Sequence, residues 1–411
     1  MQRRRGRPAR IPASDMWIAA IDHFLYYPYR ISIIDAPSKS RSPCMAVPSP
    51  EVVRAAQKAS TDMADRETPF LYDEWYVAAF TDEVGRTLLR RTILDRRIVF
   101  YRTEAGEAVA LADRCAHRSY PLSAGLLDGD TIVCGYHGFR YDVAGDCIEV
   151  PSAAKCPRSI GVKRFPLVEQ GDLVWIWMGE GDATEPDLHK LPVVSFLTSD
   201  DWTRSKGYFH HPGNYVSLHE NLLDLTHLSY VHAKSFGTPD YARAPFKTEM
   251  KDGYFKIRRS VVPTSLPPVW GDPTGLSGIA TAARIATSEF LSPAFHLVST
   301  SFYDDARPEE DRMVFSIHTA HLPTPETHGS THYFIVHGRD FALADEAVTE
   351  TMHRQLFTAF QEDVDAMSLL EDTLEHTPPS EMYEISVASD APSIGMRQYI
   401  RRRAAAAAGA A

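Results

Sequence analysis

The chain has only five cysteines in 411 residues, and the number is odd. So few cysteines exclude a scaffold built from disulfides, and they favour a reducing compartment, so we expect a cytoplasmic protein. Long apolar runs are also missing. The most apolar patch of the N-terminal region, residues 18–34, is interrupted by Asp22, His23 and Arg30. These polar residues argue against a membrane-spanning helix and against a signal peptide, so a membrane is not an expected partner.

Positive charge is scarce as well, because 43 Lys and Arg stand against 54 Asp and Glu, a net charge of −11. An acidic chain repels phosphate backbones unless its basic residues cluster, so nucleic acid is not an expected partner. The sequence also lacks the G-x-G-x-x-G fingerprint of nicotinamide- and flavin-binding domains. The chain is therefore not expected to contain such a domain.

The length predicts two or three domains, since a domain averages about 150 residues. Residues 1–66 are expected to be a disordered extension, or sequence upstream of a true start at Met45 or Met63. Residues 67–180 are expected to form a small all-β domain, because short β-rich runs alternate there with glycine and proline. These runs are 98–101, 131–133 and 173–177.

The polar stretch between Gly179 and Pro192 marks the domain boundary, and residues 181–402 are expected to form an α+β domain. Residues 403–411 form an alanine-rich tail, and we expect the chain to fray from Arg401 onward. The elements expected in the second domain are a polar helix near 217–231, strands at 254–262, 295–302 and 332–336, and a long helix over about 345–374.

Two Cys/His pairs occur in the β-rich segment. Cys115-Ala-His117 and Cys134-Gly-Tyr-His137 each place one thiol and one imidazole in a turn. Four such ligands could hold a tetrahedral zinc ion, but zinc fingers usually pair Cys with Cys and His with His. A [2Fe–2S] cluster with two thiolates on one iron and two imidazoles on the other requires each turn to reach both irons, as this order allows. Cys44, Cys147 and Cys156 are interpreted as packing residues.

A second group of ligand-type residues lies in the predicted polar helix. Asn221, Asp224 and His227 recur every three residues and form one stripe, which could also be an ordinary solvated face. His232 follows five residues after His227, out of register with one ideal helical face. Both imidazoles could therefore bind one metal only if the helix ends or bulges between them.

The long C-terminal helix adds a carboxylate inside an apolar stripe. Asp363 follows Leu356 and Phe360 and precedes Met367, Leu370 and Leu374 at spacings of three and four. A lone carboxylate in this position would be costly to bury unless a cation, a metal or a proton balanced it. Asp365 falls on the polar face and needs no such partner. Two histidines and one buried carboxylate would form the facial triad of a ferrous oxygenase.

These motifs, in this order, resemble the Rieske non-haem iron aromatic oxygenases over most of residues 70–402. The stretch Glu220–His232, with Pro267–Trp270 and Phe360–Asp363, is most similar to the group of the vanillate O-demethylase oxygenase component and dicamba monooxygenase. The resemblance implies an all-β Rieske domain followed by an α+β, helix-grip-like catalytic domain.

The resemblance also implies cofactors and residue roles. A [2Fe–2S] cluster would be bound by Cys115, His117, Cys134 and His137, and mononuclear Fe(II) by His227, His232 and Asp363, with Asn221 near the open side of the iron. Asp224 would orient an iron histidine and, in a head-to-tail homotrimer, link it to His137 of the neighbouring chain. Electrons would come from NAD(P)H through a separate ferredoxin or flavin reductase. With O2, the enzyme would hydroxylate or O-demethylate an aromatic acid such as vanillate.

Several alternatives stay open at this point. The chemistry could be ring or methyl hydroxylation of another aromatic, because these reactions share the same metal ligands. Asp224 could be the iron ligand, with Asp363 in support. The chain could instead be a Rieske electron-transfer protein or a zinc-stabilised ligand-binding module. Trp270, Phe295 and His296 are candidates for substrate contact, although buried aromatics more often belong to the core.

Overall fold

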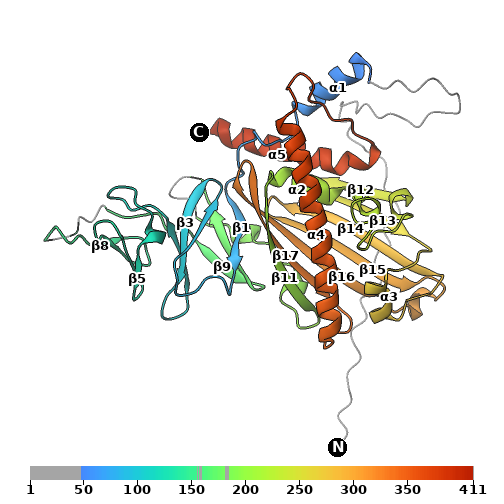
Figure 1. Cartoon of the computed structure of the whole chain (residues 1–411), viewed down its shortest axis with the longest axis horizontal. Coiled ribbons are helices and arrows are strands. Elements are labelled where there is room, and N and C mark those ends of the chain that lie inside the picture. The colour runs from blue at the N-terminus through green and yellow to red at the C-terminus, as the bar shows by residue number, and fades with distance from the viewer. Residues whose placement is uncertain (1–47, 155, 157–159, 181–184, 411) are drawn as a thin grey trace, which may run out of the picture.

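The computed structural model describes residues 48–154, 156, 160–180 and 185–410 (Figure 1). Cys44, Met45 and the apolar patch 18–34 lie outside the described residues. The proposed boundary at residues 180 and 181 stays a prediction, because 181–184 are also outside them. Within the described ranges, none of the helices combines the length and the apolar character needed to cross a membrane.

Three small antiparallel sheets form the N-terminal domain. The expected β-rich runs lie in three of its strands, β3, β6 and β10. One sheet has the order β1-β10-β9, another β2-β3-β4, and the third, β5 to β8, lies at the far tip of the molecule (Figure 1). The strands are β1 (Glu74–Phe80), β2 (Leu89–Ile93), β3 (Arg96–Arg102), β4 (Ala108–Ala112), β5 (Leu126–Asp128), β6 (Thr131–Val133), β7 (Arg140–Tyr141), β8 (Cys147–Glu149), β9 (Leu167–Gln170) and β10 (Leu173–Met178).

One seven-stranded antiparallel sheet organises the C-terminal domain, in the order β11-β17-β16-β15-β14-β13-β12. The three strands expected from the sequence are present as β13, β15 and β17. The strands are β11 (Thr203–His211), β12 (Phe246–Lys251), β13 (Tyr254–Val261), β14 (Ala282–Ser292), β15 (Phe295–Asp304), β16 (Phe315–Thr327) and β17 (Ser330–Arg339). The domain is α+β, because its helices cover the sheet instead of alternating with the strands.

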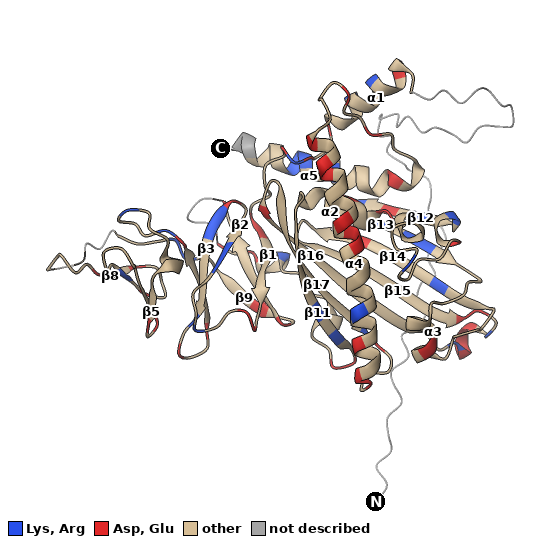
Figure 2. Cartoon of the chain, in the orientation of Figure 1, with Lys and Arg blue, Asp and Glu red and all other residues tan. Residues whose placement is uncertain are grey.

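The helices of this domain are α2 (Tyr215–Leu223), α3 (Pro268–Thr274), α4 (Glu346–Glu375) and α5 (Ala391–Ala410). Helix α4 crosses the face of the large sheet (Figure 1) and begins where the Asp345 side chain accepts the Val348 N–H. Acidic residues recur along α4 (Figure 2), but Asp363 is the only charged residue among those the helix buries. The predicted apolar stripe is correct through Met367, whereas Leu370 is exposed.

Two expectations about the chain ends are wrong within the described residues. Part of the expected disordered extension is helix α1 (Pro50–Ser60). The chain that follows α1 contacts α5, where Arg397 Nε donates a hydrogen bond to the Ala64 carbonyl. The chain does not fray from Arg401, because α5 continues through this stretch and Arg403 donates a hydrogen bond to the buried Glu74. Both segments are ordered by contacts between residues far apart in sequence.

The two domains share one hydrophobic core. Trp75 and Trp175 from the N-terminal domain pack with Phe295 and Phe334 from the large sheet, and all four side chains are buried. The rings of Trp175 and Phe295 are stacked, with centroids 6.4 Å apart. Because the core crosses the domain boundary, it fixes the orientation of the N-terminal domain against the large sheet.

We predict that Phe295→Ala destabilises the whole chain by about 3–5 kcal/mol, because it leaves a cavity in this shared core. Leu369→Ala is the control, since Leu369 is 71% exposed and its loss should change stability by roughly 0.5 kcal/mol or less. Calorimetric melting of the two variants checks the difference. Equal melting temperatures would show that the shared core does not join the domains.

Candidate metal centres and substrate cavity

The two Cys/His pairs lie on two loops with matching backbone structure. The Cys115 N–H donates to the Tyr120 carbonyl, and the Cys134 N–H donates to the Phe139 carbonyl, each five residues ahead. The fourth residue after each cysteine, Ser119 or Gly138, has a positive φ of 57° or 73°. This backbone turns each loop back on itself, which brings its cysteine and histidine to the same side.

The loops bring the four predicted cluster residues together. Cys115 and Cys134 are buried, whereas the His117 and His137 rings are exposed, with centroids 4.6 Å apart. Burial raises the pKa of the Cys134 thiol in the metal-free site. Within the described part of the chain, these four groups do not form a cluster of ligand atoms within 4.8 Å of one another, as a single zinc ion would require. The donor set fits a two-iron cluster better.

Tyr141 contacts the buried side of this centre. Its hydroxyl lies 3.2 Å from Cys115 Sγ and accepts the Ala116 N–H at 3.1 Å. If Cys115 binds iron as a thiolate, the phenol must be the donor to sulfur, because a thiolate has no proton to give. Hydrogen bonds to cluster sulfurs are one of the ways in which a protein sets the cluster potential.

The second group of ligand-type residues is not on one continuous helix, as the sequence pattern predicted. Helix α2 ends at Leu223, Asp224 is its C-terminal cap, and His227 begins a separate 3-10 turn, η4 (His227–Ser229). The Asp224 carboxylate accepts the Thr226 N–H at 2.7 Å, which favours the turn over another helical one. This break meets the condition under which His227 and His232 could face one metal.

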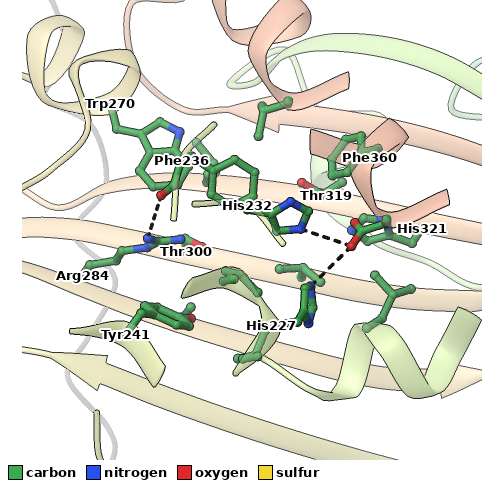
Figure 3. Close-up of a pocket in the computed structure, with 18 residues that line it drawn as sticks. His227, His232, Phe236, Tyr241, Trp270, Arg284, Thr300, Thr319, His321 and Phe360 are labelled. Carbon is green, nitrogen blue, oxygen red and sulfur yellow. Dashed lines mark hydrogen bonds and ion pairs between the residues drawn. The ribbon is translucent and has the colours of Figure 1, made fainter. Parts of the chain in front are cut away.

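His227, His232 and Asp363 converge, with ligand atoms within 4.8 Å of one another. Asp363 Oδ1 lies 3.1 Å from His232 Nε2 and 3.5 Å from His227 Nε2 (Figure 3). Among the described residues, this is the one such group of three or more. Two imidazoles and one carboxylate fit a ferrous ion with open coordination positions.

The protonation of these groups also fits a metal site. Burial alone would raise the pKa of Asp363, but the hydrogen bond from His232 and the nearby His227 lower it. Burial lowers the pKa of His227, whereas hydrogen bonds to Asp363 and Glu362 raise that of His232 despite its burial. Asp363 is thus a carboxylate at neutral pH, and a metal ion would compete with a proton at His232.

Three polar residues surround this group. Glu362 lies 3.0 Å from His232 Nδ1, and a hydrogen bond there leaves His232 Nε2 to face Asp363. Asn221 Nδ2 donates to Asp363 Oδ1 at 3.2 Å. The Asp224 carboxylate has no hydrogen bond to His227 among the described contacts. The Asp224 backbone lies close enough to raise the pKa of His227, but the buried His227 Nδ1 makes no hydrogen bond of normal geometry. Glu362 is not among the residues predicted for this site, although it directly precedes Asp363 in the sequence.

A histidine network fixes α2 against the sheet. His219 Nε2 lies 2.9 Å from the Pro293 carbonyl, and its Nδ1 lies 3.4 Å from His296. His296 contacts Ser288 Oγ, which donates to the Leu222 carbonyl at 2.6 Å. His296 is therefore a structural residue. Phe295 belongs to the shared core, and of the three candidates for substrate contact only Trp270 lines the cavity.

The convergent group lies at one end of an apolar cavity between the helices and the large sheet. The cavity has an empty volume of about 600 Å³, including the part open to solvent. Its walls come from α2, α3, α4 and strands β14 to β16, and from the segments around η4 and η5 (Tyr241–Arg243). Figure 3 shows His227 and His232 at one end and Trp270, Arg284 and Tyr241 at the other. Such a cavity suits a small, mainly apolar ligand.

The fold and the two centres define a Rieske non-haem iron oxygenase. The family model of the Rieske [2Fe-2S] domain matches residues 74–166, and that of the vanillate O-demethylase oxygenase C-terminal domain matches residues 212–406. The chain is 32% identical to the toluene-4-sulfonate monooxygenase system iron-sulfur subunit of Comamonas testosteroni, over 78% of this chain and 93% of that protein. It is 32% identical to the dicamba O-demethylase oxygenase component of Stenotrophomonas maltophilia, over 67% and 80%.

The chain belongs to this oxygenase family. Among solved structures, dicamba monooxygenase bound to dicamba is similar, with a TM-score of 0.74 at 26% identity over 83% of this chain and 99% of that one. The protein is thus the terminal oxygenase component of a Rieske-type monooxygenase, with a [2Fe–2S] cluster and non-haem iron, which acts on an aromatic substrate and depends on a separate reductase.

We predict that Glu362→Ala weakens binding of mononuclear iron by about 10–100-fold, because His232 loses the group that orients it. The neighbouring Asp365→Ala is the matched control, since Asp365 is exposed and contacts only Gln361 among the described residues. Anaerobic titration with ferrous iron measures the affinity, and the visible spectrum of the cluster reports intact folding. An unchanged affinity in Glu362→Ala would contradict the orienting role.

Proposed function

We propose that this oxygenase hydroxylates or O-demethylates an aromatic acid such as vanillate. The observation that carries the proposal is the convergence of His227, His232 and Asp363 at one end of a cavity whose walls are mainly apolar and aromatic. An aromatic ring in this cavity would place one substituent beside the convergent group.

The residue roles are part of the same proposal. Cys115, His117, Cys134 and His137 bind the [2Fe–2S] cluster, and His227, His232 and Asp363 bind the mononuclear iron. The cluster supplies electrons one at a time, and the ferrous centre supplies the capacity to activate O2. Glu362 holds His232 in the required orientation. Asn221 restrains the Asp363 oxygen by its hydrogen bond, and the apolar walls exclude water from the reacting carbon.

The atoms and electrons of the overall demethylation balance with O2 and two electrons from the reductase. An aryl methyl ether, O2, two electrons and two protons give an aryl hydroxymethyl ether and water. The hydroxymethyl ether is a hemiacetal, and it breaks into a phenol and formaldehyde. The electrons come from NAD(P)H through the separate ferredoxin or flavin reductase. With a methyl group in place of the methoxy group, the same reactants give a benzylic alcohol, so methyl hydroxylation is the second candidate reaction.

We further propose that the oxygenase works as a head-to-tail homotrimer. His117 and His137 are exposed, and His137 lies between β6 and β7 of the sheet β5 to β8, which is at the opposite end of the molecule from α2 and α4 (Figure 1). A neighbouring chain would bring its own tip to the half-buried Asp224, whose charge acts on His227. In this arrangement Asp224 links the neighbouring cluster to the buried, unpartnered His227 Nδ1. A cytoplasmic location is also proposed, because five cysteines in 411 residues are typical of proteins from a reducing compartment.

We expect formaldehyde release with at least one methoxybenzoate when the purified oxygenase is combined with NADH and a ferredoxin or flavin reductase. Oxygen uptake and product formation are measured across 2-, 3- and 4-methoxybenzoate, vanillate and 4-methylbenzenesulfonate. Formaldehyde identifies demethylation, and a benzylic alcohol identifies methyl hydroxylation. The proposal fails if the iron-loaded enzyme converts none of these aromatic anions.

For Asp224→Asn, we predict that single-turnover product formation from reduced cluster slows by about 10–100-fold, because the link between the two centres is lost. Iron content should stay at the wild-type level, as it should in the control Asp365→Asn. The rival assignment, in which Asp224 itself binds iron, predicts loss of mononuclear iron in Asp224→Ala and its retention in Asp363→Ala. Light scattering of the wild-type protein tests the trimer independently.

A further inference from the structure

Four arginines of the described chain are buried: Arg259, Arg284, Arg339 and Arg397. All except Arg284 have evident structural partners. Arg259 donates to carbonyls around η5 and to Thr226 Oγ1, and Arg339 donates to carbonyls before and at the start of α4. Arg397 pairs with Glu220 and Glu384. Each of these guanidinium groups joins segments of the backbone or balances acids.

Arg284 is different. It is 2% exposed, its Nε has no hydrogen-bond partner, and its one hydrogen bond is a long contact of 3.5 Å from Nη1 to the Phe236 carbonyl. Among the described residues, no carboxylate forms an ion pair with it. Against the effect of burial, the negative charge of Asp240 raises the pKa of Arg284, but Asp240 Oδ2 accepts its hydrogen bond from Thr264. A buried guanidinium without an anion is costly, so its position requires an explanation.

Aromatic rings surround this cation. The Arg284 Cζ lies 4.4 Å from the centroid of the Trp270 ring and 4.6 Å from that of Tyr241. Ring faces offset part of the cost of burial through cation–π attraction, but they accept none of the planar N–H bonds. Trp270 Nε1 and Tyr241 Oη are also buried without partners, in the same cavity. This end of the cavity therefore has more hydrogen-bond donors than the acceptors around it satisfy.

We infer that Arg284 binds the anionic group of the substrate, a carboxylate or a sulfonate, at the end of the cavity away from the convergent histidines. This inference rests on the proposed function and names the residue that selects its substrate class. A planar guanidinium fork matches two oxygens of such a group, and desolvation strengthens the pair. The ring of the substrate then spans the apolar middle of the cavity.

The position of Arg284 also restricts where the substrate reacts. Figure 3 shows Arg284 and His227 at different ends of the cavity, so the anionic group and the reacting substituent cannot be adjacent on the ring. A 4-substituted benzoate or benzenesulfonate meets this requirement best, and a 3-methoxybenzoate such as vanillate also meets it. A 2-substituted one does not, because its two groups are adjacent.

The test compares wild-type protein with Arg284→Met, which keeps the length of the side chain and removes its charge, and with Arg284→Lys. The control is Arg354→Met, since the Arg354 side chain is 63% exposed on α4. Calorimetric binding to the iron-loaded, anaerobic protein is measured for 4-methoxybenzoate, 4-methoxybenzenesulfonate, 2-methoxybenzoate and the neutral 4-methoxybenzyl alcohol.

We expect Arg284→Met to weaken binding of the preferred 4-substituted anion at least about 30-fold, the loss typical of a truncated buried charge pair. Binding of the neutral alcohol should change less than about threefold, and Arg284→Lys should recover part of the affinity for the anion. Binding of the carboxylate and of the sulfonate is measured separately, and the anion that binds more tightly identifies the preferred acid group. The wild-type protein should also bind 4-methoxybenzoate more tightly than the 2-isomer.

Equal losses for the anion and the alcohol would assign Arg284 a structural role, and unchanged binding of the anion would overturn the inference. It would also be overturned if the wild-type protein bound neither anion more tightly than the alcohol. Because binding is measured without O2 or electrons, it separates this inference from the proposed reaction. Arg284-dependent binding without turnover would reject only the proposed function, and turnover of anions unaffected by Arg284→Met would reject only this inference.

Discussion

The buried carboxylate of Asp363 is the constraint on which the catalytic domain depends. It interrupts the apolar stripe of α4, where an unbalanced negative charge would oppose folding. Contacts with His227, His232 and Asn221 offset that cost, and they connect α4 to the end of α2 and to η4. The arrangement is complete only if α2 stops at Leu223, because a continuing helix would keep the two histidines on different faces.

The cavity has opposite electrostatic character at its two ends. One end has the Asp363 carboxylate and two imidazoles, and the other has the Arg284 cation within aromatic rings. The walls between them are largely apolar, so the field of each end is weakly screened. A flat molecule with an acid at one end and a methyl or methoxy group at the other matches this distribution. The binding orientation of the substrate would thus follow from charge and length.

The domain arrangement separates electron delivery from the site of reaction within one chain. The core shared by Trp175 and Phe295 fixes the N-terminal domain beside the large sheet, while the sheet β5 to β8 lies at the end of the molecule away from α4 (Figure 1). A rigid orientation of this kind disfavours a swing of the loops toward their own catalytic domain. It is compatible with transfer between chains, for which Asp224 is the proposed link.

The sequence by itself determined the ligand types, their order and the main elements. The spacing of the Cys/His pairs and the position of Asp363 within an apolar stripe are local patterns, and local patterns fix which residues share a turn or a helix face. Tertiary structure decided where α2 ends, that Glu362 contacts His232, and that residues 50–60 and 401–403 are ordered. It also decided that Arg284 is left without a partner. No spacing along the chain predicts such a contact, since the partners of a buried charge come from strands and helices that are distant in sequence.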